Sequence, residues 1–68
     1  MMKVFCERLR ELRKEKNLST TQVGKSIGVS HATISRWENG LVSPPIEHLY
    51  SLAIFFGVSS DYLLGIEN

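Results

Sequence analysis

The residues that could carry out chemistry are few in this chain of 68 residues. The single cysteine, Cys6, lies far along the sequence from His31 and His48, so the spacing typical of a metal site is absent. No nucleophile, base and orienting group stand out as a catalytic set, and so short a chain has little room for a deep pocket. We therefore expect no enzyme, no metal site, no cofactor and no small-molecule substrate.

The most informative polar residues lie in the stretch GVSHATISRW, residues 28–37. Ile34 and Trp37 are spaced to face a helical core, which turns the polar side chains around them outward. Those side chains are short or flexible enough to enter a DNA major groove. The outward side chains are those of His31, Ala32, Ser35 and Arg36.

The elements that would position this stretch follow from apolar spacing and helix-end signals. Met2, Phe5, Leu9 and Leu12 recur at helical intervals and predict an amphipathic first helix that ends near Asn17.

Two short helices follow, joined by a turn that contains a glycine. Ser19 and Gln22 fit a capping box at the start of a helix over about 20–27. Ser30 can cap a third helix over about 31–39, which the letters ENG would close.

A fourth and a fifth helix complete the pattern. Pro44 and Pro45 break the chain and allow a new helix to begin. Ser59 or Ser60 caps a last short helix that runs through Leu64. The apolar stripe of the fourth helix consists of Ile46, Leu49, Leu52, Ala53 and Phe56.

The whole chain, residues 1–68, is expected to form one all-α domain of five helices, because no stretch alternates like a strand and no repeat is visible. Val23 and Ile27 give the second helix an inward face that can meet the third in a helix-turn-helix. Gly24 in the middle of that second helix costs about 1 kcal/mol of helix propensity relative to alanine. We expect a close approach of the third helix to explain it.

The charges are unevenly distributed although the net charge is only +1. Residues 1–36 hold all eight Lys and Arg with three acidic residues, whereas residues 37–68 hold four acidic residues and no Lys or Arg. This asymmetry favours one face that meets an anion. A basic first helix that is simply solvated would give the same pattern, so both interpretations stay open.

Composition argues for a folded domain in a reducing compartment. Apolar residues make up 43% of the chain, and Lys3, Glu7 and Arg8 interrupt the N-terminus, so neither a membrane span nor a signal peptide is predicted. Cys6 is expected to be a helix residue of the kind that free cysteines often form in protein interiors. We expect the cytoplasm as the location.

The sequence closely resembles the Cro/repressor-type helix-turn-helix family, the xenobiotic-response-element-like regulators of bacteria and phages. The resemblance runs from Phe5 to Leu64, on the motifs RLRELRKEKNLS, IGVSHATISRWENG, SPP and LAIFFGVSSDYLLG. It implies a five-helix domain whose third helix reads double-stranded operator DNA, as a homodimer on a palindromic site. It also implies a transcriptional regulator, with repression as the expected direction.

The resemblance assigns roles to residues of the third helix. His31, Ala32 and Arg36 match base-contacting positions of the family, and Ser35, on the same outer face, is the fourth candidate for contacting bases. Arginine is the commonest reader of guanine, through O6 and N7, and Ala32 could touch a thymine methyl group. Alternatively, Arg36 holds a phosphate or a solvated charge, and His31 is an ordinary residue at a helix start.

Other positions match phosphate contacts of the family. Thr20 stands where the family usually has a longer glutamine, although backbone N–H groups at this helix start can still bind phosphate. Leu41 and Val42 replace the Lys or Arg that the family often has in the next loop, so a monomer should bind weakly. The candidates for phosphate contact are Thr20, Gln22, Thr33, Asn39 and Ser43, of which Gln22 fits the capping box better.

Two further expectations come from the resemblance. Glu38 matches a position that pairs with an arginine late in the first helix, here Arg13. Tyr62, Leu63 and Ile66 lie where the family often forms its dimer contact, although Tyr62 and Leu63 could equally close the core over Phe5.

An alternative function uses the same fold to bind a protein, as antitoxins of this family can do. A protein-binding face should carry aromatic anchors. The polar outer face of the third helix favours DNA instead.

Overall fold

The computed structural model describes residues 2–67, which form five helices and no strand. The all-α, five-helix prediction is therefore confirmed. Among these residues, none of the helices is both long and apolar enough to cross a bilayer. The helices are α1 (Met2–Glu15), α2 (Thr20–Ile27), α3 (His31–Glu38), α4 (Ile46–Phe56) and α5 (Ser60–Leu64).

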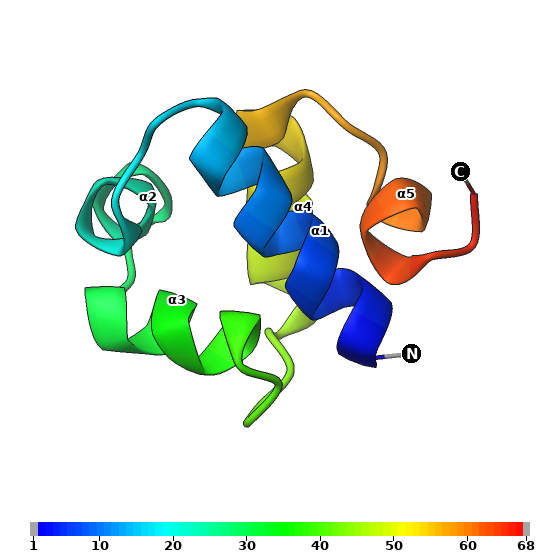
Figure 1. Cartoon of the computed structure of the whole chain (residues 1–68), viewed down its shortest axis with the longest axis horizontal. Coiled ribbons are helices and arrows are strands. Elements are labelled where there is room, and N and C mark those ends of the chain that lie inside the picture. The colour runs from blue at the N-terminus through cyan, green and yellow to red at the C-terminus, as the bar shows by residue number, and fades with distance from the viewer. Residues whose placement is uncertain (1, 68) are drawn as a thin grey trace.

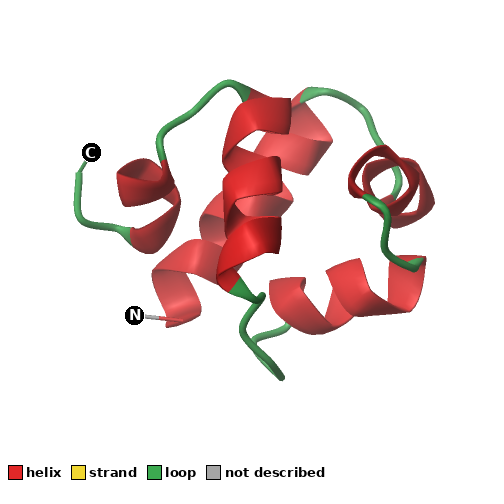
Figure 2. Cartoon of the chain, turned by 180° about the vertical axis from the view of Figure 1, so that it is seen from behind, coloured by secondary structure: helices red, strands yellow, loops and turns green. Residues whose placement is uncertain are grey.

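The helices surround one core, with α2 and α3 on one side and α5 on the other (Figure 1). Helix α1 lies in front of α4 at the centre of this view, and the view from behind reverses the two (Figure 2). Helix α3 packs on both α2 and α1, whereas α5 packs on α1 and α4. The helix-turn-helix pair and the last helix are thus held at opposite sides of the same two central helices.

All five helices contribute to the core. Leu63 of α5 is 0% exposed and closes the core together with Phe5, so it is unavailable to a second copy, and its candidacy as a dimer contact is wrong. Ile46 is 81% exposed, which corrects its place in the apolar stripe of α4. It begins that helix, about two turns before the buried Ala53 and past the edge of the core. The side chain of Met2 lies outside the described residues.

Serine side chains define three helix starts. Ser19 and Gln22 form the full capping box at α2, as the sequence predicts. Ser30 accepts a hydrogen bond from the backbone of Thr33, and Ser59, rather than Ser60, caps α5. Helix α1 ends at Glu15, slightly earlier than expected.

Gly24 allows the turn of the helix-turn-helix to close against α2. A Cβ added at this glycine would lie 2.5 Å from the carbonyl oxygen of Val29 and 3.2 Å from the carbonyl carbon of Ser30. The close neighbour is therefore the backbone leading into α3, rather than α3 itself as expected. Both Gly28 and Val29 donate backbone hydrogen bonds to the Gly24 carbonyl, at 2.8 Å each.

A buried ion pair joins α1 to α3. Arg13 donates to the two carboxylate oxygens of Glu38, from Nε at 2.6 Å and from Nη2 at 2.9 Å. Glu38 is only 5% exposed, and its hydrogen bonds raise the pKa of the Arg13 guanidinium above its usual value. Arg13 also donates to the carbonyl of Leu18 at 3.0 Å, so one side chain holds α3 and the segment that enters α2.

Gly24→Ala tests the close approach at the turn. Helix propensity alone would stabilise the variant by about 1 kcal/mol. Because the added methyl group meets immobile backbone, we expect instead a loss of about 1–3 kcal/mol in the free energy of unfolding. Urea unfolding measures the difference, with Ser26→Ala on the exposed side of the same helix as a control that changes by less than about 0.5 kcal/mol. A more stable Gly24→Ala protein would contradict the geometry.

Glu38→Ala tests the buried ion pair. The substitution leaves the Arg13 charge partly buried without its partner, which should cost up to about 3–5 kcal/mol. Such a loss approaches the whole stability of a small domain. Thermal unfolding should show a large drop in midpoint, whereas Glu11→Ala on the exposed face of α1 should leave the midpoint nearly unchanged. An unchanged midpoint for Glu38→Ala would show that the pair contributes nothing.

Candidate nucleic-acid interface

The outer face of α3 is the candidate interface. Ile34 and Trp37 are buried beneath it, and the helix lies along one edge of the molecule (Figure 1). His31 and Arg36 are exposed, while Ala32 and Ser35 are half-buried. All four predicted base-contacting residues thus retain surface from which they could reach a ligand.

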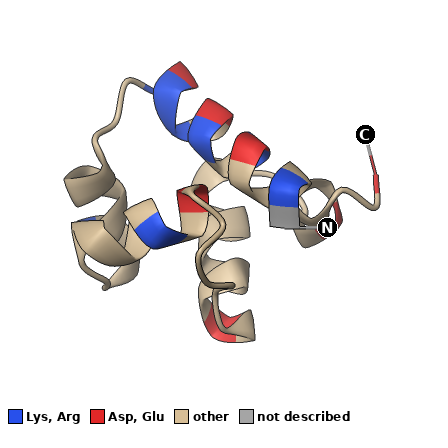
Figure 3. Ribbon diagram, turned by 60° about the horizontal axis from the view of Figure 1, so that its bottom comes forward, with Lys and Arg blue, Asp and Glu red and all other residues tan. Residues whose placement is uncertain are grey.

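The Lys and Arg residues gather mainly on α1, and α4 and α5 carry none of them (Figure 3). Three arginines of α1 hold groups of the protein itself, which changes both sequence-based interpretations of the basic half. Arg13 pairs with Glu38, Arg10 donates to the Glu38 carbonyl, and Arg8 donates to the carbonyls of Tyr62 and Glu67 and stacks on the Tyr62 ring. These arginines are neither a simply solvated face nor a set of freely extended phosphate ligands. On α3, Arg36 is the only Lys or Arg.

The start of α2 presents a capped helix end. Thr20 is its first residue and is half-buried. The Oε1 atom of Gln22 accepts a hydrogen bond from the Ser19 N–H at 2.7 Å, which is the capping role that the sequence favoured. The amide nitrogen of this exposed side chain is the group that could still donate to a phosphate.

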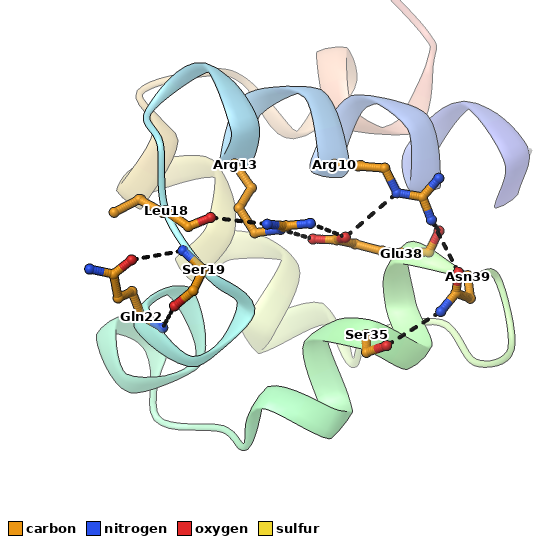
Figure 4. Close-up of polar contacts among 8 residues, drawn as sticks. All are labelled: Arg10, Arg13, Leu18, Ser19, Gln22, Ser35, Glu38 and Asn39. Carbon is orange, nitrogen blue, oxygen red and sulfur yellow. Dashed lines mark hydrogen bonds and ion pairs between the residues drawn. The ribbon is translucent and has the colours of Figure 1, made fainter.

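The end of α3 is organised by a residue that sequence reasoning missed. Arg10 donates from Nη2 to the carbonyl of Glu38 at 3.0 Å and to Oδ1 of Asn39 at 3.1 Å (Figure 4). Asn39 in turn donates to Oγ of Ser35 at 3.3 Å. A signal existed, because Arg10 precedes Arg13 by three residues and so shares its helix face.

The remaining phosphate candidates lie near the two ends of α3. Thr33 sits in the first turn, where its hydroxyl lies 3.0 Å from that of Ser30. Ser43 is exposed in the loop after α3, next to the exposed Leu41 and Val42. Residues 40–45 of this loop contain no Lys or Arg, so the loop presents no cationic side chain to an anion.

The three candidates for a dimer contact differ in their accessibility. Tyr62 is half-buried under Arg8, and Leu63 belongs to the core. Ile66, just beyond α5, is 71% exposed. Of the three, Ile66 presents the largest free apolar surface.

Comparisons with known proteins agree with this geometry. A family model described as helix-turn-helix (HTH_3) matches residues 9–63. The HTH-type transcriptional regulator YobD of Bacillus subtilis (strain 168) is 36% identical over 93% of this chain and 56% of its own length. The HTH-type transcriptional activator BcrR of Enterococcus faecalis is 41% identical over 93% of this chain and 31% of its own. This chain thus spans about half or less of these relatives.

A solved structure extends the likeness to three dimensions. The crystal structure of the P22 c2 repressor protein in complex with the synthetic operator 9T matches this fold with a TM-score of 0.84. The two are 37% identical, and the match covers 87% of this chain and 89% of that one. The family match covers far more than half of the sequence, and the chain therefore belongs to the helix-turn-helix family.

Proposed function

We propose that this protein is a sequence-specific DNA-binding transcriptional regulator, with repression as its direction, that inserts α3 into the major groove of a palindromic operator. The observation that carries the proposal is the outer face of α3, which is polar, holds Arg36 and rests on a helix-turn-helix like that of an operator-bound repressor. Residues 1–68 would act as one DNA-binding domain. Work on genomic DNA would place the protein in the cytoplasm.

Within this proposal the candidate residues divide into two groups. His31, Ala32, Ser35 and Arg36 face base edges, with guanine O6 and N7 as the preferred partners of Arg36. The phosphate contacts come from N–H groups at the start of α2 and from the side chains of Thr20, Gln22, Thr33, Asn39 and Ser43. Because the phosphate-contacting residues carry no full positive charge, one copy of the protein binds weakly. Stable binding to a palindromic site therefore needs two copies.

A second candidate function is protein binding of the antitoxin kind. It is favoured by a groove of about 470 Å³ between α4 and α5, beside the exposed apolar residues Ile46, Tyr50 and Ile54. Selection of bound duplexes from a random-sequence pool separates the two functions. A palindromic consensus supports the regulator, whereas failure to enrich any sequence favours the protein-binding module.

Arg36→Ala tests base reading by α3. Loss of a bidentate contact to guanine should weaken binding to the selected operator by about 1–3 kcal/mol and relax preference at one base pair. Titrations on the operator and on its single-base variants, at several salt concentrations, measure both effects. Equal weakening on every duplex, with a salt slope lower by about one, would identify Arg36 as a phosphate contact instead.

The proposed homodimer is tested by stoichiometry. Sedimentation of the protein with a palindromic duplex should give two chains per duplex. The reason is that two recognition helices about 34–36 Å apart would enter successive major grooves. Ile66→Asp should weaken the second binding step, because it places a charge in the proposed contact. Ile54→Asp is the matched control on α4. A strict one-to-one complex excludes the dimer, and an effect of Ile54→Asp alone would move the contact to α4.

A further inference from the structure

A chain of hydrogen bonds runs from the middle of α1 to the outer face of α3 (Figure 4). The guanidinium of Arg10 donates to Asn39 Oδ1, and Asn39 Nδ2 donates to Ser35 Oγ, over distances of 3.1 and 3.3 Å. Asn39 and Ser35 are both candidates for DNA contact, whereas Arg10 belongs to a different helix. The network therefore connects the reading surface to a residue that itself is not among the candidates.

The direction of these hydrogen bonds follows from the chemistry of the first donor. A guanidinium has only donors, so the Asn39 atom that faces Arg10 must be the oxygen. The Asn39 nitrogen is then the atom that faces Ser35, and it can only donate. Because Ser35 Oγ accepts this hydrogen bond, its own O–H is directed away from Asn39 and can donate to a ligand.

Arg10 is itself held in place, so the first donor of this series of hydrogen bonds has a fixed position. Its Nη2 also donates to the Glu38 carbonyl at 3.0 Å, and its Nε lies 3.7 Å from the Glu38 carboxylate. That carboxylate is buried and engaged by Arg13. The side chain of Arg10 is 41% exposed, so the substitution of Arg10 removes these hydrogen bonds without opening the core.

We propose that Arg10 is a positioning residue that makes Ser35 a hydrogen-bond donor at the DNA surface. Arg10 thereby determines which base Ser35 prefers. This inference rests on the proposed function. A donor suits guanine O6 and N7, adenine N7 or thymine O4, whereas cytosine presents only the N4 donor and would have to use the remaining lone pair of Ser35 Oγ. The specificity of α3 is thereby determined partly from α1.

Without Arg10, the hydrogen bond between Asn39 and Ser35 no longer has a fixed direction. The Asn39 amide can then rotate and present its oxygen to Ser35, whose O–H donates inward and leaves its lone pairs facing DNA. Toward DNA, Ser35 would donate when the Asn39 nitrogen faces it and accept when the Asn39 oxygen faces it. Discrimination at the base pair beneath it would fall, while contacts made by Arg36 would be unaffected.

The experiment begins by locating the base pair that Ser35 reads. Ser35→Ala is titrated against the selected operator and every single-base variant, and the pair whose preference disappears is the reference pair. Arg10→Met should reduce discrimination at that same pair by about fivefold, the size of one ordinary hydrogen bond. Arg10→Lys retains a charged donor and should restore most of it. Lys14→Met removes the same charge from an exposed position on α1 and should leave the preference intact.

Asn39→Asp provides a second test that keeps Arg10. The carboxylate it introduces only accepts, so Ser35 must donate inward, and the reference pair should shift toward cytosine. Unfolding midpoints accompany each titration, so that either variant can support the inference if the other fails to fold. Unchanged discrimination in both folded variants, or no reference pair for Ser35→Ala, overturns the inference and leaves the proposed function standing. Absence of any consensus for the unmodified protein overturns both.

Discussion

The buried carboxylate of Glu38 is the constraint on which the half of this domain that contains α2 and α3 depends. A carboxylate 5% exposed needs hydrogen bonds and a counter-charge, and Arg13 supplies both from another helix. Because Arg13 also binds the Leu18 carbonyl, the guanidinium connects α1, the entry to α2 and the last turn of α3. Helix α3 cannot rotate about its axis without breaking this contact, so the residues on its outer face keep a fixed direction.

Much of the fold could be predicted because its boundaries are set locally. A serine hydroxyl meets an N–H three residues later at α2, α3 and α5, and each of these interactions is encoded within four residues. The end of α1 is also local, since Asn17 takes a left-handed backbone with φ of 55°. The inward positions of Val23, Ile34 and Trp37 follow from helical spacing, and all three are buried.

The features that sequence reasoning missed depend on segments far apart in the chain. Spacing places Ile46 on the same stripe as Ala53, but only the extent of the packed core decides which of the two is covered. Arg10 looks like any solvated residue of a basic helix until α3 brings Asn39 within 3.1 Å of it. The direction of a hydrogen bond at Ser35 is further removed from the sequence, since it requires both of these contacts to be known.

The internal use of arginines also has a consequence for recognition. With Arg8, Arg10 and Arg13 held by carbonyls and Glu38, the other cations of the chain are Arg36 and four lysines. Affinity for arbitrary DNA comes almost entirely from neutralised phosphates, so in the proposed complex it would rest mainly on Arg36 and the lysines. Selectivity is the ratio of operator affinity to this background. A domain with low affinity for non-specific DNA needs only modest base contacts to be selective. The side chains that make these contacts must be held in one direction, and two copies must act together.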